Sequence, residues 1–131
     1  MDRKYYQEYY DIERNHWWFR ARQDILMAII EKHLIDKKRD NKKILNIGAA
    51  TGATTQMLMA YGEVVTVEYD KYCCDFLSEE LNINAINASM TALPFTDNMF
   101  DLVCAFDVIE HIEDDAVALK EIYRVMKSDG N

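Results

Sequence analysis

A glycine turn and one acidic residue are the parts of this sequence whose types and spacing could do chemistry. The turn runs from Gly48 to Gly52, directly after the apolar run 44–47, and residues 54–61 beyond it have helical character. A strand, a glycine turn and a helix in this order open a nucleotide-type α/β site, because glycine lets the backbone approach a ligand closely. Glu68 follows 20 residues after Gly48, at the end of a predicted strand, where its carboxylate could accept hydrogen bonds from both hydroxyls of a ribose.

Glu68 has an alternative interpretation as a strand-end acid that merely faces water. Asp70, two residues further on, could make the same ribose contact or could cap the helix that begins near Tyr72. The preceding glycine turn favours ribose binding for Glu68, and both roles of Asp70 stay open.

The elements that must position these groups alternate between strand and helix. Residues 3–36 are predicted to be helical. Strands are expected at 43–47, 64–68, 85–88 and 100–106, and helices at 54–61, at 72–81 and after the fourth strand. This alternation predicts an α/β fold, a Rossmann-like doubly wound parallel sheet of about four strands with an N-terminal helical leader. We divide the chain into a leader or lid at residues 1–42 and a ligand-binding domain at residues 43–131.

Composition narrows the class of protein. A chain of 131 residues that is 50% hydrophobic can bury a core as one domain without disulfides or a metal. The net charge is −8 and the basic residues are thinly spread, which argues against a nucleic-acid partner. No apolar run reaches the length of a membrane span. Three cysteines without C-x-x-C spacing, Cys73, Cys74 and Cys104, suggest reduced thiols in a cytoplasmic protein and indicate no metal site.

Two classes of cofactor fit a glycine turn followed by a ribose-binding acid, namely dinucleotides and S-adenosylmethionine. A dinucleotide site commonly has the sequence G-x-G-x-x-G, whereas this chain has glycine at 48, alanine at 50, glycine at 52 and no glycine at 53. A nicotinamide-dependent oxidoreductase is therefore the weaker alternative.

Several further segments occur in a recognisable order. They are the L-P-F segment at 93–95, the F-D-L-V strand at 100–103, the E-H pair at 110–111 and the R-V-M-K run at 124–127. With the glycine turn and Glu68, residues 43–131 resemble class I S-adenosylmethionine-dependent methyltransferases, most closely the small-molecule branch that contains ubiquinone and menaquinone methyltransferases. The H-W-W-F-x-x-R run at 16–22 also resembles the leader of a methyltransferase subgroup, in which leading helices often cover cofactor or substrate. The aromatic side chains at 17–19 could face a sulfonium by cation–π attraction or could anchor the leader on the sheet.

The resemblance implies S-adenosylmethionine as cofactor, S-adenosylhomocysteine as product and a small-molecule methyl acceptor. Carried over position by position, it assigns the turn to the methionine and ribose portion, Glu68 to the ribose, Ser89 and Met90 to the adenine, and Phe106 and Asp107 to the methionine moiety. The full expected set of cofactor-binding residues is Asn46, Gly48, Ala49, Ala50, Gly52, Glu68, Tyr69, Ser89, Met90, Phe106 and Asp107. His111 would face the reaction chamber as a candidate base, or would be structural.

Three positions depart from the family pattern. Asn46 and Ser89 stand where the family usually has Asp, and Ala50 stands where it usually has Gly. Together they predict weaker cofactor binding, and they favour a non-catalytic S-adenosylmethionine-binding or regulatory module as the alternative function. The end of the chain at 127–131 resembles the turn that leads into a fifth strand. We therefore expect either a fragment, truncated after the fourth strand, or a short protein whose uncovered sheet edge could form a homodimer.

Overall fold

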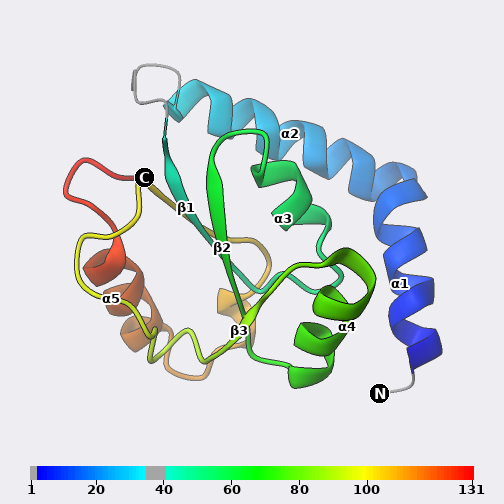
Figure 1. The fold of residues 1–131 in the computed structure, drawn as a ribbon. Helices are drawn as coiled ribbons and strands as arrows, with labels where there is room; N and C mark the ends of the chain where they lie inside the picture. Colours follow the sequence, from blue (N-terminus) through cyan, green and yellow to red (C-terminus); the bar gives the residue numbers. More distant parts are fainter. Residues whose placement is uncertain (1–2, 35–40) are drawn as a thin grey trace.

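The computed structural model describes residues 3–34 and 41–131; residues 1–2 and 35–40, which belong to the predicted leader, lie outside the described part. Two leading helices precede an alternation of strands and helices (Figure 1). In chain order the elements are α1 (Arg3–Asn15), α2 (Trp17–Leu34), β1 (Lys43–Ile47), α3 (Ala53–Leu58), β2 (Glu63–Glu68), α4 (Lys71–Leu81), β3 (Ile86–Asn87), β4 (Leu102–Ala105), the short 3₁₀ helix η1 (Ile109–His111) and α5 (Asp115–Val125).

The four strands form one parallel sheet in the order β3-β2-β1-β4. β1 lies in the middle, where Ile44 pairs with Val64 of β2 and with Leu102 of β4. The chain builds outward from β1 to β3 and then returns to place β4 on the other side of β1. In such a sheet a ligand crevice forms at the carboxyl ends of the strands where the order reverses, here between β1 and β4. The predicted α/β, Rossmann-like fold is confirmed.

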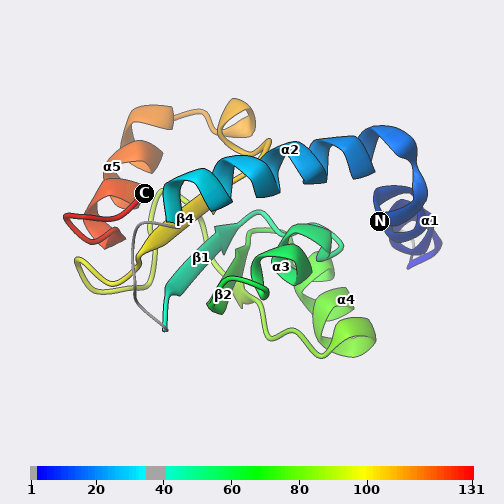
Figure 2. The same cartoon turned by 90° about the horizontal axis from the view of Figure 1, so that it is seen from above.

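Helices cover both faces of the sheet because successive residues of a buried strand point to opposite sides. Ile44 packs in a core cluster with residues of α2 and α3, whereas Leu45 and Ile47 pack in a second cluster with residues of α5. α2 extends from α1 toward the side of the molecule where β4 and α5 lie (Figure 2). The leader is thus part of the covering layer and reaches both the glycine turn and the outer strand.

The leader consists of two helices, in agreement with the helical character predicted for this segment; positions 35–36 of the predicted range lie outside the described residues. The helical run breaks at His16, whose Nδ1 accepts a hydrogen bond from the N–H of Trp18 at 3.3 Å. A side chain that accepts a backbone N–H at a helix start satisfies a donor that the helix leaves unpaired. The break lets α1 pack on α4 through Tyr6 while α2 packs on the sheet through Ile30, two surfaces that one straight helix would not reach.

The observed bounds of the strands agree with the predicted bounds at the centre of the sheet and differ from them at its edges. β1 has the predicted bounds, but β3 has two residues instead of the four expected at 85–88, and β4 is shorter than the expected 100–106. Phe100 makes an isolated bridge with Met126, because its N–H donates to the carbonyl of Val125 at the end of α5 and its carbonyl accepts the N–H of Lys127. Edge strands have fewer partners, so competing local contacts shorten them.

One arginine joins the L-P-F segment to α5. The guanidinium of Arg124 donates to the carbonyl of Leu93 at 3.0 Å, to the carbonyl of Phe95 at 2.7 Å and to the carboxylate of Glu121 at 2.8 and 2.9 Å. Glu121 in turn accepts from the N–H of Leu93 at 2.8 Å. The contact explains physically why the L-P-F and R-V-M-K segments occur together, since each supplies the hydrogen-bond partners of the other.

Candidate functional site

The glycine turn has the left-handed backbone that its composition predicts. Gly48 and Gly52 have φ of 76° and 90°, and Ala50 between them has φ of 47°. A Cβ on Gly48 would lie 2.3 Å from Cγ2 of Val108, so this position has no room for a side chain. Gly52 ends the turn as the N-terminal cap of α3. The turn therefore brings its backbone against the β4–α5 connection without a side chain between them.

Glu68 holds this turn in place. Its side chain is buried at the end of β2, where Oε2 accepts the N–H of Ala50 at 3.0 Å and Oε1 accepts the N–H of Asp70 at 3.1 Å. Each carboxylate oxygen can accept a second hydrogen bond, so two acceptor positions remain. Asp70 accepts the N–H of Tyr72 at 2.8 Å and caps α4, which is one of the two roles that the sequence left open.

A cavity of about 560 Å³, which we call the strand-end cavity, lies beside Glu68. This volume is in the range of about 300–1,000 Å³ that small-molecule sites usually have. It is lined by six residues predicted from the sequence, Gly48, Glu68, Tyr69, Ser89, Met90 and His111, and by seven that were not predicted, Ile47, Ala88, Thr91, Val108, Ile112, Glu113 and Asp114. The structure thus brings together residues that lie up to 67 positions apart, as counted from Ile47 to Asp114.

A second, smaller cavity of about 110 Å³, which we call the leader cavity, is also lined by Gly48. Four predicted residues line it, Gly48, Ala50, Phe106 and Asp107, together with Tyr9, Glu13, Phe19, Arg22 and Thr54. Four of these additional residues come from α1 and α2. The sequence indicated that the leader could cover a ligand, but it assigned no role to Tyr9, Glu13 or Arg22, because nothing local in the leader says which side chains face the turn.

Glu13 is a buried acid in the wall of the leader cavity. It accepts a hydrogen bond from the hydroxyl of Thr51. Burial raises the pKa of Glu13 above its ordinary value, and the Thr51 hydroxyl, the nearby Arg14 and the N–H of Ala53 oppose this shift. Arg14 next to it donates to the carbonyl of Thr51 at 3.1 Å and to Gln56 at 2.6 Å. α1 is therefore fastened to the glycine turn by polar contacts that include a carboxyl group removed from water.

Three residues of the expected cofactor set build the turn without lining either cavity. Asn46 is fully buried beneath α3, where its Nδ2 donates to the hydroxyls of Thr54 at 3.1 Å and Thr55 at 2.9 Å. Its Oδ1 is buried without a hydrogen-bond partner. Ala49 is buried against α4, and Gly52 caps α3. Asn46 lies beneath α3 because successive residues of β1 point to opposite faces of the sheet. Asn46 therefore points to the same face as Ile44, which packs against α3.

Two of the aromatic side chains at 17–19 are exposed to solvent, and the third lines the leader cavity. Trp17 and Trp18 have exposed fractions of 72% and 48%, and neither of them lines a cavity at the glycine turn. Phe19 lines the leader cavity, and its ring meets that of Tyr9 edge-on with centroids 5.9 Å apart. Anchoring is done instead by Tyr6, whose hydroxyl donates to Asp70 at 3.1 Å.

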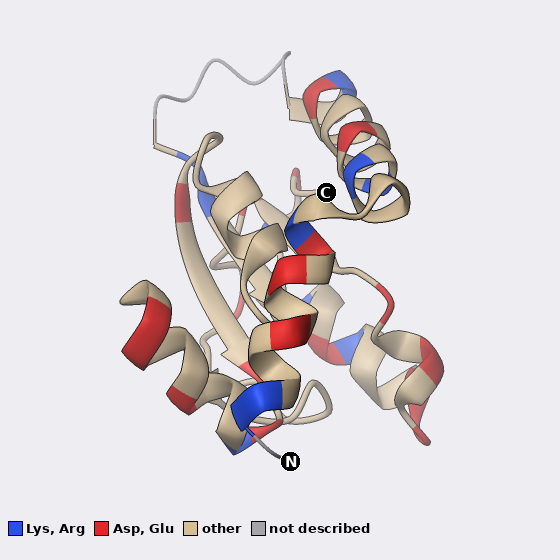
Figure 3. Ribbon diagram, turned by 90° about the vertical axis from the view of Figure 1, so that its right-hand side faces the viewer, with Lys and Arg blue, Asp and Glu red and all other residues tan. Residues whose placement is uncertain are grey.

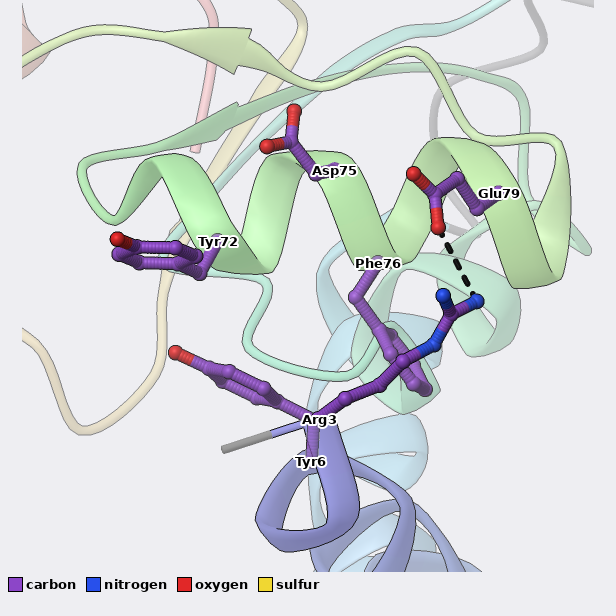
Figure 4. A pocket seen from close by; sticks show the side chains of 6 residues that line it. All are labelled: Arg3, Tyr6, Tyr72, Asp75, Phe76 and Glu79. Carbon is purple, nitrogen blue, oxygen red and sulfur yellow. Dashed lines mark ion pairs between the residues drawn. The ribbon is translucent and has the colours of Figure 1, made fainter. Parts of the chain in front are cut away.

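A further cavity of about 200 Å³ lies between α1 and α4, away from the glycine turn (Figure 4). Its lining includes Arg3 and Glu79, which form an ion pair at 3.1 Å, and the ring of Phe76, which faces Tyr6 of α1. The lining contains no residue that the sequence predicted as functional. We interpret this cavity as a gap at the end of the contact between two helices.

We also searched the described ranges 3–34 and 41–131 for a metal site, a reactive cysteine, a charged surface and a membrane-spanning helix. These residues contain no group of three or more His, Cys, Asp or Glu arranged to hold a metal ion. Burial raises the pKa of the Cys104 thiol to about 12, so this cysteine is unreactive at neutral pH. Lys and Arg are interspersed with Asp and Glu along the helices (Figure 3). Among the helices of the described part, none has the length and apolar content that crossing a membrane requires.

Known proteins resemble this chain in both sequence and fold. A ubiquinone/menaquinone biosynthesis C-methyltransferase from Pectobacterium atrosepticum is 30% identical over 103 residues, which are 70% of this chain and 41% of that protein. A Mycobacterium tuberculosis protein named as a probable S-adenosylmethionine-dependent methyltransferase is 25% identical over 122 residues, which are 92% of this chain and 42% of that protein. The chain therefore spans about two-fifths of the length of these relatives.

The fold has solved counterparts as well. The crystal structure of a candidate S-adenosyl-L-methionine-dependent methyltransferase from Methanococcus maripaludis superposes with a TM-score of 0.77 at 21% identity, covering 98% of this chain and 61% of that one. The family model described as a methyltransferase domain matches residues 45–131, which begin within β1 and include the glycine turn, Glu68 and the whole strand-end cavity. By this match the chain belongs to the methyltransferase-domain family.

Proposed function

We propose that this chain binds S-adenosylmethionine and serves in methyl transfer to a small-molecule acceptor. The observation that carries the proposal is Glu68, a buried carboxylate at the end of β2 that is bonded to the glycine turn and lines a cavity large enough for a nucleoside. Family membership supports it independently. The residues present fit the cofactor, because Glu68 keeps two acceptor positions and Gly48 leaves no side chain between the two cavities.

In this proposal the nucleoside occupies the strand-end cavity. The ribose hydroxyls donate to Glu68, while Tyr69, Ser89 and Met90 lie along the nucleoside. Ser89 is a weaker partner than the usual Asp, because its hydroxyl is already bonded to the N–H of Thr91 at 3.2 Å and to the Thr91 hydroxyl at 2.8 Å. The methionine end passes Gly48 toward Ala50, Phe106 and Asp107.

The bound cofactor supplies a sulfonium methyl group, and the nucleophile is an oxygen, nitrogen or carbon of the acceptor. The protein has to align the acceptor with that methyl group and exclude water, which can account for much of a rate enhancement. His111 lies exposed on the rim of the strand-end cavity and is the candidate base for an acceptor proton. The same position would equally allow His111 to hold the acceptor by a hydrogen bond.

The proposed class of methyl acceptor is based on the names of related proteins. One of them is named as a C-methyltransferase of ubiquinone and menaquinone biosynthesis, so a small organic acceptor is the proposal for this chain too. The thinly spread basic residues and the net charge of −8 support the absence of a nucleic-acid partner. A cytoplasmic location belongs to the same proposal and rests on the three buried cysteines, which form no disulfide.

A homodimer through the sheet edge is also proposed. β4 is the outer strand of the sheet, and Ile29 and His33 of α2 line a hollow beside it together with residues 102–106. The first part of this edge is paired with Asn131, whose carbonyl accepts the N–H of Val103 at 2.8 Å. Sedimentation velocity would show a concentration-dependent dimer, and a monomer at all concentrations would remove this part of the proposal.

A non-catalytic binding module is the second candidate function. Ala50 favours it, because an alanine in the left-handed region adds a methyl group and strain where the cofactor would approach. The two functions share the binding step and differ in turnover.

Calorimetry with S-adenosylmethionine, S-adenosylhomocysteine and NADH tests the proposal. We expect both S-adenosyl compounds to bind and NADH not to bind. Failure of both S-adenosyl compounds to bind would overturn the proposal, and binding of NADH alone would favour the oxidoreductase alternative. Transfer of labelled methyl groups to a library of small acceptors would then separate an enzyme from a binding module.

A further inference from the structure

The side chain of Asn87 holds the backbone at the end of β2 from the neighbouring strand. Its Nδ2 donates to the carbonyl of Glu68 at 3.0 Å and to the carbonyl of Tyr69 at 2.7 Å. Asn87 is the last residue of β3, and its pair with Glu68 is the last of the two pairs that join β2 to β3. A side-chain amide carries the same kind of N–H donor as the backbone. Asn87 therefore extends the hydrogen bonding of the sheet to Tyr69, one residue past the end of β2.

One of the peptide groups that Asn87 contacts also orients the carboxylate of Glu68. The peptide group between Tyr69 and Asp70 has its carbonyl on Tyr69 and its N–H on Asp70. The carbonyl accepts from Asn87, and the N–H donates to Oε1 of Glu68 at 3.1 Å. Because a peptide group is planar, holding the carbonyl also fixes the direction of the N–H. Asn87 thus acts on the Glu68 carboxylate through a single peptide group.

The other contacts of Glu68 do not depend on this peptide group. Oε2 accepts the N–H of Ala50 at 3.0 Å, and the main-chain carbonyl of Glu68 also accepts the N–H of Ala88 at 3.2 Å. Loss of the Asn87 amide would therefore leave both of these contacts in place and would release the peptide group that holds Oε1. A carboxylate held at one oxygen can turn, whereas one held at both oxygens presents its remaining acceptor positions in a fixed direction.

Asn87 lies outside the cavity that it supports. Glu68 and Tyr69 line the strand-end cavity on one side of Asn87 in the sheet, and Ala88 and Ser89 line it just after Asn87 in the sequence, but the Asn87 side chain is not part of the lining. Asn87 is exposed to solvent. Its replacement should therefore change ligand binding only through the residues that its amide holds.

We propose that Asn87 is a positioning residue for ribose recognition, which holds the peptide group between Tyr69 and Asp70 so that the Glu68 carboxylate keeps both oxygens in place for the two ribose hydroxyls. The proposal rests on the proposed function. A residue that only stabilised the edge of the sheet would affect every ligand of the strand-end cavity alike. A residue that orients Glu68 affects only ligands that carry the ribose hydroxyls.

The test compares S-adenosylhomocysteine with its 2′,3′-dideoxy analogue, which lacks both ribose hydroxyls. Calorimetry on the 131-residue chain should show tighter binding of S-adenosylhomocysteine. Asn87→Ala should weaken that ligand by about 3- to 10-fold, the scale of one neutral hydrogen bond, and leave the analogue unchanged. Asn87→Asp should weaken it further, because a carboxylate of nearly the same shape places a negative charge, and no donor, against the two carbonyls.

Asn84→Ala is the matched control, since Asn84 is an exposed asparagine just before β3 that lines neither cavity. It should leave both affinities unchanged. No loss in Asn87→Ala, or equal losses for the two ligands, would overturn the assignment of Asn87 and leave the proposed function intact. If Asn87→Ala fails to fold, equal losses for both ligands in Asn87→Asp overturn the assignment.

The unaltered chain supplies two further outcomes. Equal affinities for S-adenosylhomocysteine and the dideoxy analogue would overturn the role of Asn87, because the ribose hydroxyls would then contribute nothing to binding. Binding of neither ligand would overturn both proposals.

Discussion

The strand-end cavity and the leader cavity share Gly48 but are assembled in different ways. The first is lined entirely by residues 47–114, which fall within the family match and lie on strand ends and the connections after them. The second joins residues 9–22 of the leader to the glycine turn and to residues 106–107. Its contacts span 38 residues between Glu13 and Thr51 and 85 residues between Arg22 and Asp107. A common fold thus supplies the larger cavity, and a separate pair of helices completes the smaller one.

This difference means that the two cavities depend on different contacts. The residues of the strand-end cavity are positioned by the register of the sheet and by the connections that follow its strands. The leader cavity depends in addition on contacts of the leader with the turn, such as that of Glu13 with Thr51. Perturbing Gly48 should affect both cavities, whereas perturbing Glu68, Glu13 or Ala50 should affect one more than the other.

The largest effect is expected from Gly48→Ala. The new Cβ would meet Val108 Cγ2 at 2.3 Å, at a backbone φ of 76°. The left-handed conformation alone costs about 1–2 kcal/mol for alanine, and the clash adds to this. Urea unfolding and calorimetry should show lower stability and loss of S-adenosylhomocysteine binding. Adding Val108→Ala should recover part of the stability by removing the clash; unchanged binding in the single variant would contradict the view that both cavities meet at this residue.

Glu68→Ala should weaken cofactor binding by about 1–3 kcal/mol, because it removes a charged hydrogen-bond acceptor. The ribose is common to S-adenosylhomocysteine and to 5′-methylthioadenosine, which has the nucleoside and sulfur but lacks the amino-acid end, so both ligands should lose affinity. Calorimetry with both ligands measures the effect. Glu63→Ala, at the exposed start of the same strand, serves as the control. An affinity that does not change in Glu68→Ala would mean that Glu68 only holds the turn.

Glu13→Gln should change how stability depends on pH. Burial raises the folded-state pKa of Glu13 above its ordinary value of 4.5. Below pH 4.5 the carboxyl is protonated in both states, and as the pH rises through the folded-state pKa, ionisation in the buried site costs stability. The Glu13→Gln variant lacks this loss and keeps an acceptor for Thr51. Melting temperatures of the two proteins should therefore diverge as pH rises, and parallel curves would contradict the prediction.

The smallest effect is expected from Ala50→Gly. The change removes left-handed strain of about 1–2 kcal/mol and adds a chain-entropy cost of roughly 0.5–1 kcal/mol. The net gain should be about 0.5 kcal/mol in urea unfolding. Ala49→Gly is the control next to it, since Ala49 is buried, has no positive φ, and should destabilise the fold when shortened. A loss of stability in Ala50→Gly would show that the alanine methyl packs favourably in the turn.

Much of the fold could be predicted because the signals are local. The bounds of β1 were predicted, and α3 starts within one residue of the predicted position 54, because an apolar run and a glycine turn act locally. α3 ends at Leu58 and not at the predicted 61, and the cap of α4 at Asp70 is one of the two roles that the sequence left open. The prediction was poorer for strand ends, whose positions depend on pairing with segments that are distant in the sequence. β3 is short because it pairs only with β2 at the sheet edge, and Phe100 leaves β4 because its backbone pairs with Val125, the last residue of α5, and with Lys127.

The sequence by itself determined the order of the elements, the glycine turn, the acid at the end of β2 and the resemblance to methyltransferases, since each depends on residue types at short spacing. Only the tertiary structure decided that Asn46 lies beneath α3, that Trp17 is exposed and that Arg22 meets Asp107 beside the turn. The reason is that a side chain's partner across 85 residues depends on how the intervening helices and strands pack. The glycine turn is thus a property of the sequence, and the small charged cavity over it is a property of the fold.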